Sequence, residues 1–290
     1  MKILISDAFD ASLPGRLEKF GEVFTDTARV QEADVVLIRS KTKCTKEYIE
    51  KAPNLKLIIR GGVGIDNIDS EFAKTRGIEV RNTPAASSVA VAELAMALML
   101  AVPNKLTFGH EGMMKGEWRK KEIKRTELFK KTLGLVGIGR IASEVAIRAK
   151  AFGMKVIAYD KYVTASDVAE MKTLDEVLAQ ADYLSLHTPF TPETSKMINK
   201  ETLAKMKDGA IIINTGRGKC VDEDAVVEAL QSGKLAGYGT DVWYSDPPEN
   251  SPLIGAPNVT ALPHIGASSK ENLLRIGDIV VEIIEEFSKK

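Results

Sequence analysis

The sequence predicts an α/β protein with two parallel sheets, each covered by helices. Three observations lead to this prediction. Short β-branched, apolar runs alternate with amphipathic helices in two series, one over residues 1–84 and one from residue 132 onward. The 290 residues are enough for two domains of ordinary size, each with its own core. A glycine-rich turn joins a strand to a helix at the start of the second series.

The first series has strands expected over residues 3–5, 35–38, 57–59 and 78–80, with helices between them over residues 13–20, 46–51 and 70–76. Asn82-Thr83-Pro84 ends the last strand. An Ala- and Met-rich helix follows over residues 87–101, and we expect Pro103 to close it. Because small apolar residues lie nearly all round this helix, it should be buried between layers or domains.

The second series has strands expected over residues 132–136, 155–159, 183–186, 210–214, 235–239 and 259–261. One helix runs from the glycine-rich turn to about Phe152, and a final helix covers residues 268–287. In a parallel α/β sheet, ligands bind where loops leave the carboxyl ends of the strands. Several charged or reactive side chains are expected at such ends: Arg39, Arg60, Asp160, His187, Arg217, Asp241 and His264.

The turn at residues 137–142 has the features of a dinucleotide-binding motif. Gly137 permits the tight turn, and Gly139 lets a pyrophosphate approach the N–H groups at the start of the helix. Ala142 replaces the third glycine and still lets helix and strand pack closely. Asp160 ends the next strand, where its carboxylate would accept hydrogen bonds from ribose hydroxyls and repel a 2′-phosphate, which favours NAD over NADP. A glycine triplet alone also fits an ordinary turn, but the full order of elements indicates a Rossmann-like NAD-binding domain.

The composition argues against several other classes of protein. Lys plus Arg and Asp plus Glu number 40 each, so no overall field attracts nucleic acid or anionic lipid. Cys44 and Cys220 make neither a disulfide framework nor a zinc site, which indicates a reducing cytoplasm and no bound metal. The N-terminus lacks the features of a signal peptide, and the most apolar segment, residues 89–102, contains Glu93 and is too short to span a bilayer. We therefore expect a soluble cytoplasmic protein.

The sequence contains three histidines, and different roles are expected of them. His110 lies in a polar helix and should be exposed to solvent. His187 ends a strand beside the expected cofactor cleft, where a structural hydrogen bond is favoured over catalysis. His264 lies between the last strand and the last helix, in Pro263-His264-Ile265-Gly266. A buried structural histidine would fit there too, but proton transfer is favoured once its companions are considered.

Two residues could cooperate with His264. Arg217 lies in a glycine-rich turn after a strongly apolar strand, and a guanidinium held rigidly there can grip a carboxylate through two hydrogen bonds. Asp246 precedes two prolines and is either a turn former or, if it reaches His264, the group that fixes the ring tautomer and stabilises the imidazolium. Oxidation of a carbinol carbon requires an acid–base group for the hydroxyl proton and a cation for the carboxylate of the acid. Together these three residues can supply both.

Four motifs occur in a fixed order: Gly137-Ile138-Gly139-Arg140-Ile141, Asn214-Thr215-Gly216-Arg217-Gly218, Gly239-Thr240-Asp241-Val242 and Pro263-His264-Ile265-Gly266. In this order and spacing the sequence resembles the D-isomer-specific 2-hydroxyacid dehydrogenases, and the resemblance covers essentially the whole chain. Within the family it is most similar to the phosphoglycerate dehydrogenases. That similarity lies in residues 36–40, in residues 60–69, and in Gly116-Glu117-Trp118 followed by a basic run.

The resemblance implies roles for particular residues. Arg217, Asp246 and His264 would be catalytic. NAD would be bound by Gly137, Gly139, Arg140, Ile141, Asp160, His187, Thr188, Thr215, Gly216, Asp241, Gly266 and Ala267. The substrate would meet Arg39, Arg60, Val63 and Gly64. The resemblance also implies two Rossmann-like or flavodoxin-like domains: a discontinuous substrate-binding domain, residues 1–84 with 269–290, and an NAD-binding domain, residues 85–268, that forms a homodimer.

Three features depart from the family pattern. The residue at position 246 is usually glutamate, so Asp246 is one methylene shorter, and either the loop compensates or the partnership with His264 is weaker. Leu262 replaces a frequent threonine and lacks its hydroxyl. Longer phosphoglycerate dehydrogenases carry a C-terminal regulatory domain for serine feedback. Because this sequence ends at Lys290 after one helix, we expect no serine inhibition through such a domain.

The resemblance favours NAD-dependent oxidation of 3-phospho-D-glycerate to 3-phosphohydroxypyruvate, the first step of phosphorylated serine biosynthesis. Arg39 and Arg60 beside one small pocket are more than an unphosphorylated acid needs, although surface ion pairs would also account for them. One alternative keeps the chemistry and changes the substrate to D-lactate, glycerate, glyoxylate or hydroxypyruvate. Another, from a different class, is an NAD-sensing binding protein like the family's transcriptional corepressors. The presence of all three expected catalytic residues argues against it.

Overall fold

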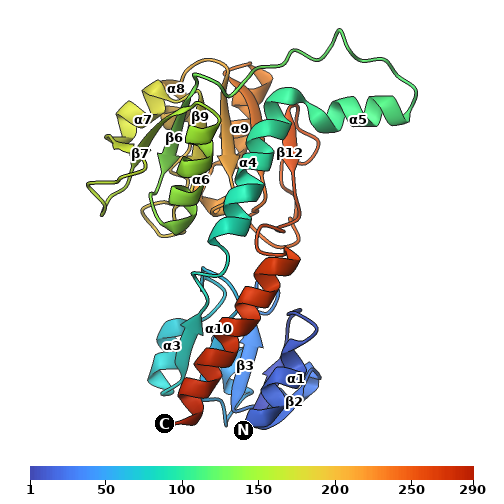
Figure 1. Cartoon of the computed structure of the whole chain (residues 1–290), viewed down its shortest axis with the longest axis vertical. Coiled ribbons are helices and arrows are strands. Elements are labelled where there is room, and N and C mark those ends of the chain that lie inside the picture. The colour runs from blue at the N-terminus through green and yellow to red at the C-terminus, as the bar shows by residue number, and fades with distance from the viewer. The chain divides into compact units, whose positions relative to one another are not determined.

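The computed structural model describes residues 1–290 and divides into two compact units (Figure 1). Unit 1 contains Met1–Ala90 and Ala267–Lys290, and unit 2 contains Val91–Gly266. The chain therefore leaves unit 1 once and returns to it once. The boundaries expected from the sequence, after Pro84 and after Ser268, lie a few residues from these. The assignment of substrate to unit 1 and NAD to unit 2 stays a prediction.

Unit 1 is built on a five-stranded sheet in the order β2-β1-β3-β4-β5, with every neighbouring pair parallel. The strands are β1 (Lys2–Ile5), β2 (Glu22–Phe24), β3 (Val35–Ile38), β4 (Leu57–Arg60) and β5 (Glu79–Asn82). The helices are α1 (Leu13–Leu17), η1 (Glu18–Phe20), η2 (Thr27–Glu32), α2 (Lys46–Glu50), α3 (Ser70–Thr75) and α10 (Lys270–Ser288). Successive strand residues point to opposite faces, so each face has its own core. Ile3 and Leu37 pack with α1 and α10, whereas Leu4 and Val36 pack with α2 and α3.

Unit 2 is built on a seven-stranded parallel sheet in the order β12-β11-β10-β9-β6-β7-β8. The strands are β6 (Thr132–Val136), β7 (Lys155–Tyr159), β8 (Glu170–Met171), β9 (Tyr183–Leu186), β10 (Ala210–Asn214), β11 (Leu235–Thr240) and β12 (Val259–Ala261). The helices are α4 (Ser88–Asn104), which begins in unit 1, α5 (Leu106–Met114), α6 (Arg140–Ala151), α7 (Leu174–Gln180), α8 (Lys200–Lys205), η3 (Gly218–Cys220) and α9 (Glu223–Gln231). The chain builds outward from β6 to β8 and then returns to β9, so the strand order reverses between β6 and β9.

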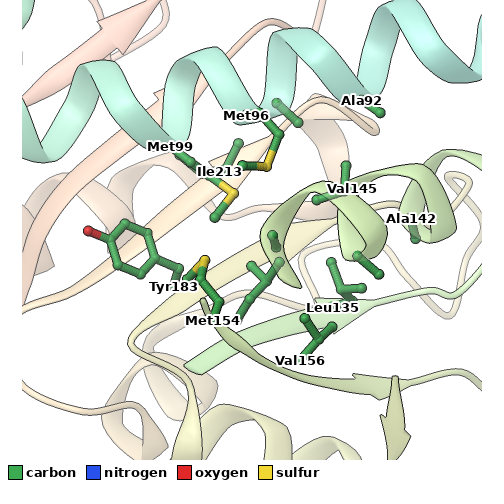
Figure 2. Packing of buried hydrophobic residues seen from close by; sticks show 14 of the residues in the cluster. Ala92, Met96, Met99, Leu135, Ala142, Val145, Met154, Val156, Tyr183 and Ile213 are labelled. Carbon is green, nitrogen blue, oxygen red and sulfur yellow. The ribbon is translucent and has the colours of Figure 1, made fainter. Parts of the chain in front are cut away.

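Both faces of the second sheet are covered. Figure 2 shows one face, where Met96 and Met99 of α4 and Val145 of α6 meet strand residues such as Leu135 and Ile213. The other face packs against α7, α8 and α9. Helices on both faces make this a doubly wound sheet, in which ligands bind beyond the carboxyl ends of the strands where the order reverses.

The fold predicted from the sequence is confirmed: an α/β protein with parallel sheets. One detail is wrong, because α4 continues through Pro103 to Asn104 rather than ending before the proline. Met99 and Val102 are buried in the core, so packing fixes the last turn of α4 and outweighs the cost of proline there. The short strands β2 and β8, of three and two residues, were not predicted from the sequence. No single helix is long and apolar enough to cross a membrane; only α4 and α5 taken together, bent by 64°, satisfy that length and composition.

Candidate active site

The glycine-rich turn after β6 has the backbone that a bound pyrophosphate requires. Gly137 has φ +91°, and a Cβ there would lie 2.9 Å from the carbonyl oxygen of His187, so only glycine fits without strain. No atom lies within 4 Å of the place that a Cβ on Gly139 would occupy. Gly139 is also the N-cap of α6 and provides no side-chain cap, which leaves the first N–H groups of the helix available to an anion.

Asp160 lies at the carboxyl end of β7 and is held by the backbone. Its carboxylate accepts hydrogen bonds from the N–H groups of Ile138 (3.0 Å), Tyr162 (2.8 Å) and Val163 (3.1 Å). Burial raises the pKa of Asp160, but these N–H groups outweigh it and leave the pKa below the ordinary value. A fixed, ionised carboxylate therefore faces the edge of the turn where a dinucleotide ribose would lie.

The other residues expected around NAD follow the same edge of the sheet. Thr215 follows β10, and its hydroxyl oxygen is buried without a hydrogen-bond partner, as expected of a group that awaits a ligand. This orphaned hydroxyl, the open Gly139 and the uncapped start of α6 fit a dinucleotide. The remaining expected residues lie in the first turn of α6 or just after β9, β10, β11 and β12: Arg140, Ile141, His187, Thr188, Gly216, Asp241, Gly266 and Ala267. Of these, Ala267 is assigned to unit 1.

His187 makes an internal hydrogen bond. Its Nε2 lies 2.9 Å from the hydroxyl oxygen of Ser185, within the buried β9. Burial lowers the pKa of His187 to about 4, so the ring is neutral at neutral pH. The side chain therefore supports the structural role that the sequence favoured, and its backbone carbonyl faces Gly137.

The structure joins His264 to Asp246. A hydrogen bond links Nδ1 of His264 to Oδ2 of Asp246, so the shorter acid reaches the ring. His264 has φ +55°, and the chain after it is held by Asp241, whose oxygens accept from the N–H groups of Ile265 (2.8 Å) and Gly266 (2.7 Å). The two side chains of the pair are 31% and 32% exposed, which leaves the ring accessible to a small molecule.

Arg217 is mounted on the loop after β10. Asn214 holds this loop: its Nδ2 donates to the Arg217 carbonyl (3.1 Å), and its Oδ1 accepts from the Gly216 N–H (3.1 Å). Arg217 itself donates from Nη1 to the Gly216 carbonyl (2.7 Å). Arg217, Asp246 and His264 thus follow β10, β11 and β12, three neighbouring strands of the sheet.

The expected substrate residues lie in unit 1. Arg60 is the last residue of β4 and is paired in register with Ile38, so Arg39 and Arg60 leave adjacent strands at the same edge. Arg39 donates from Nη2 to the Ala267 carbonyl (2.8 Å). The Val63 carbonyl accepts from the side chain of Asn82, and Gly64 follows it in the same loop.

Two residues that were not predicted from the sequence support the loop of Arg39. Asp7, just after β1, accepts from the N–H groups of Arg39 (2.5 Å) and Thr42 (3.1 Å). Asn67 donates from Nδ2 to the carbonyls of the same two residues, both at 2.7 Å. Together they fix the loop that carries Arg39. The position of Asp7, a carboxylate at the carboxyl end of a strand, could have indicated its role from the sequence. Asn67 could have been noticed because it lies within the loop of residues 60–69.

Comparisons with known proteins agree with this architecture. Residues 96–266 match the family described as D-isomer specific 2-hydroxyacid dehydrogenase, NAD binding domain. The chain is 43% identical to D-3-phosphoglycerate dehydrogenase of Methanocaldococcus jannaschii, over 99% of this chain and 57% of that protein. It is 47% identical to hydroxypyruvate reductase of Thermotoga maritima, over 90% of this chain and 86% of that protein.

A solved structure has the same fold. The crystal structure of D-lactate dehydrogenase from Aquifex aeolicus, complexed with NAD and lactic acid, matches with a TM-score of 0.89 at 34% identity, over 99% of this chain and 95% of that one. The chain spans about half the length of several phosphoglycerate dehydrogenases that it matches, 57% and 49% in two cases. The matched residues include the nucleotide turn and extend to Gly266, just beyond His264. The chain belongs to the D-isomer specific 2-hydroxyacid dehydrogenase family.

Proposed function

We propose that this protein oxidises 3-phospho-D-glycerate to 3-phosphohydroxypyruvate with NAD, the first step of phosphorylated serine biosynthesis. The observation that carries the choice of substrate is the pair Arg39 and Arg60 at one edge of the unit 1 sheet. The Nε of Arg39 is buried and lacks a hydrogen-bond partner. Burial lowers the pKa of Arg39, and the nearby charge of Asp7 offsets this only in part. A cation kept in such surroundings is suited to an anionic ligand.

The proposed chemistry divides between three residues. His264 takes the proton from the substrate hydroxyl through Nε2, because its Nδ1 is engaged with Asp246. Asp246 stabilises the imidazolium that forms, and Arg217 binds and orients the substrate carboxylate. NAD supplies the hydride acceptor when it is bound. In the reverse direction His264 returns the proton to the carbonyl oxygen.

The function is tested by following NADH absorbance over a panel of substrates. Oxidation is measured with 3-phospho-D-glycerate, D-glycerate and D-lactate, and reduction with 3-phosphohydroxypyruvate, hydroxypyruvate and glyoxylate. The proposal expects the highest kcat/KM for the phosphorylated pair. A preference for hydroxypyruvate or glyoxylate would instead favour a reductase, as the similarity to the Thermotoga maritima protein suggests. NADH binding without turnover of any acid would favour a corepressor-like sensor.

We also propose that the protein acts as a cytoplasmic homodimer. In Figure 1, α5 and the segment after it extend away from the unit 2 sheet. Apolar side chains on this extension are exposed: Leu106, Met113, Met114 and Trp118. A second copy that covered them would remove this surface from water. Light scattering after gel filtration should give twice the 31.6 kDa chain mass, and a monomer at micromolar concentration would contradict the proposal.

A further inference from the structure

Of the chain's 40 acidic side chains only two, Glu223 and Asp241, are buried, with exposed fractions of 6% and 2%. A buried carboxylate reduces stability unless donors compensate for its lost hydration. The position of Asp241 has an explanation, because both its oxygens accept N–H groups just beyond His264. Glu223 has no part in the chemistry proposed above, so its burial calls for a different reason.

Glu223 is the first residue of α9, where the helix dipole favours a negative charge, but it is buried and lies between Asp222 and Asp224. Burial raises the pKa of Glu223, and the two neighbouring acids raise it further. One strong contact opposes this effect: the hydroxyl of Ser251 donates to Oε2 at 2.7 Å. Ser251 is therefore the side-chain partner that compensates the buried carboxylate of Glu223.

Ser251 lies in the loop between β11 and β12 that carries Asp246. The start of this loop is fixed where the Tyr244 hydroxyl donates to the Val221 carbonyl (2.6 Å). The far part is fixed where Ser251 meets Glu223, and Leu253 then enters the core at 2% exposure. These two hydrogen bonds tether the loop to Val221 and Glu223, at the start of α9. Asp246 lies in the segment between the two tethers.

We propose that Glu223, through Ser251, is a positioning residue that holds Asp246 within hydrogen-bond reach of His264. The inference rests on the acid–base role proposed for that pair. It gives a physical reason why an aspartate, one methylene shorter than the usual family glutamate, still contacts the ring: the anchored loop supplies the reach. The two buried acids then act on the two halves of the pair, Asp241 on the backbone after His264 and Glu223 on the loop of Asp246.

Three substitutions separate the tether from the charge. Ser251→Ala breaks the tether and leaves the Glu223 carboxylate in place. Glu223→Gln removes the charge but keeps an oxygen that can accept from Ser251. Asp246→Asn removes the charged partner of His264 and sets the full size of the effect. Glu228→Ala is the matched control, because Glu228 lies on the same helix, is 64% exposed and contacts only the exposed Lys200 among cations.

The measurement is the pH titration of the His264 ring proton by NMR in the apoprotein, below the melting temperature of each variant. Only three histidines are present, so His110→Gln and His264→Gln suffice to assign the resonance. Asp246→Asn should move the protonation midpoint of His264 to lower pH, because it removes an adjacent negative charge. Ser251→Ala should move it in the same direction by part of that amount. Glu223→Gln and Glu228→Ala should keep the wild-type midpoint.

Two results would overturn the proposal. If Ser251→Ala titrates like wild type while Asp246→Asn shifts, the tether does not position the acid. If Glu223→Gln shifts and Ser251→Ala does not, Glu223 acts through its charge. The titration needs no substrate, so these outcomes are independent of the substrate panel. A failure of the proposed function would appear separately, as a wild-type protein that turns over none of the acids.

Discussion

Lowering the pH from 8 to 5 should destabilise unit 2 through the His187 ring alone by up to about 2 kcal/mol. The ring lies against the buried strand β9, with Nε2 bonded to the Ser185 hydroxyl at 2.9 Å. Burial lowers the pKa of His187 from 6.5 to about 4 in the folded protein. The unfolded chain keeps the ordinary value.

The direction follows from which state binds the proton. Between pH 6.5 and pH 4 the unfolded chain protonates this histidine and the folded protein does not, so acid favours unfolding. The contribution is fully present above about pH 6.5 and is lost progressively as the pH falls. At pH 5 the gap is about 1.5 pH units, and each unit corresponds to about 1.36 kcal/mol, which gives about 2 kcal/mol. His187 as a residue is only half-buried, so this is an upper value.

The assay is urea unfolding of the apoprotein at several pH values, followed by tryptophan fluorescence. Both tryptophans, Trp118 and Trp243, lie in unit 2, so the signal reports on that unit. His187→Gln removes the titrating ring, and the exposed His110→Gln serves as the control. The difference in unfolding free energy between wild type and His187→Gln should shrink as the pH falls. A difference that stays constant from pH 8 to pH 5 would refute the argument from burial.

Three other predictions concern the proposed site. Asp160→Ala should narrow the preference for NAD over NADP, measured as the ratio of kcat/KM values, because it removes the charge that repels a 2′-phosphate; a wild type that uses both cofactors equally would exclude this role. Arg39→Ala or Arg60→Ala should weaken transition-state binding of a phosphorylated acid by about 1.5–3 kcal/mol and that of an unphosphorylated analogue much less; equal losses on both would assign these arginines to the shared carboxylate or to structure. Asp246→Asn should make the rate of reduction fall off at lower pH than in wild type, because the imidazolium of His264 loses its adjacent charge; an unchanged inflection would mean that another group controls the proton.

Local patterns of apolar residues predicted most of the strands and helices of this protein. The apolar runs of β9 and β10 are buried at every position, so both the existence and the bounds of these strands could be read from the sequence. β8 escaped because Glu170–Met171 is too short to show a period. The end of α4 was misjudged because burial of Met99 and Val102 depends on the folded core and not on local preference.

The candidate site divides in the same way. The nucleotide turn could be recognised because its glycines and Asp160 occupy fixed places in one strand–helix–strand unit. The sequence left open whether Asp246 contacts His264, because this contact depends on the course of a loop between two strands. Glu223 gave no signal at all. An acid at the start of a helix is ordinarily a solvated residue, and its partner Ser251 lies far along the chain.

The two parts of the proposed site in unit 2 follow strands that differ in local stability. The dinucleotide turn follows β6, a central strand buried at four of its five positions and paired on both sides. His264 follows β12, a strand of three residues at the edge, paired only with β11 and not fully buried at any position. Edge strands with few buried contacts open at lower free energy than central ones. Mild denaturant should therefore loosen the segment of His264, the proposed acid–base residue, before it loosens the dinucleotide turn, so turnover should be lost at a lower denaturant concentration than binding at that turn.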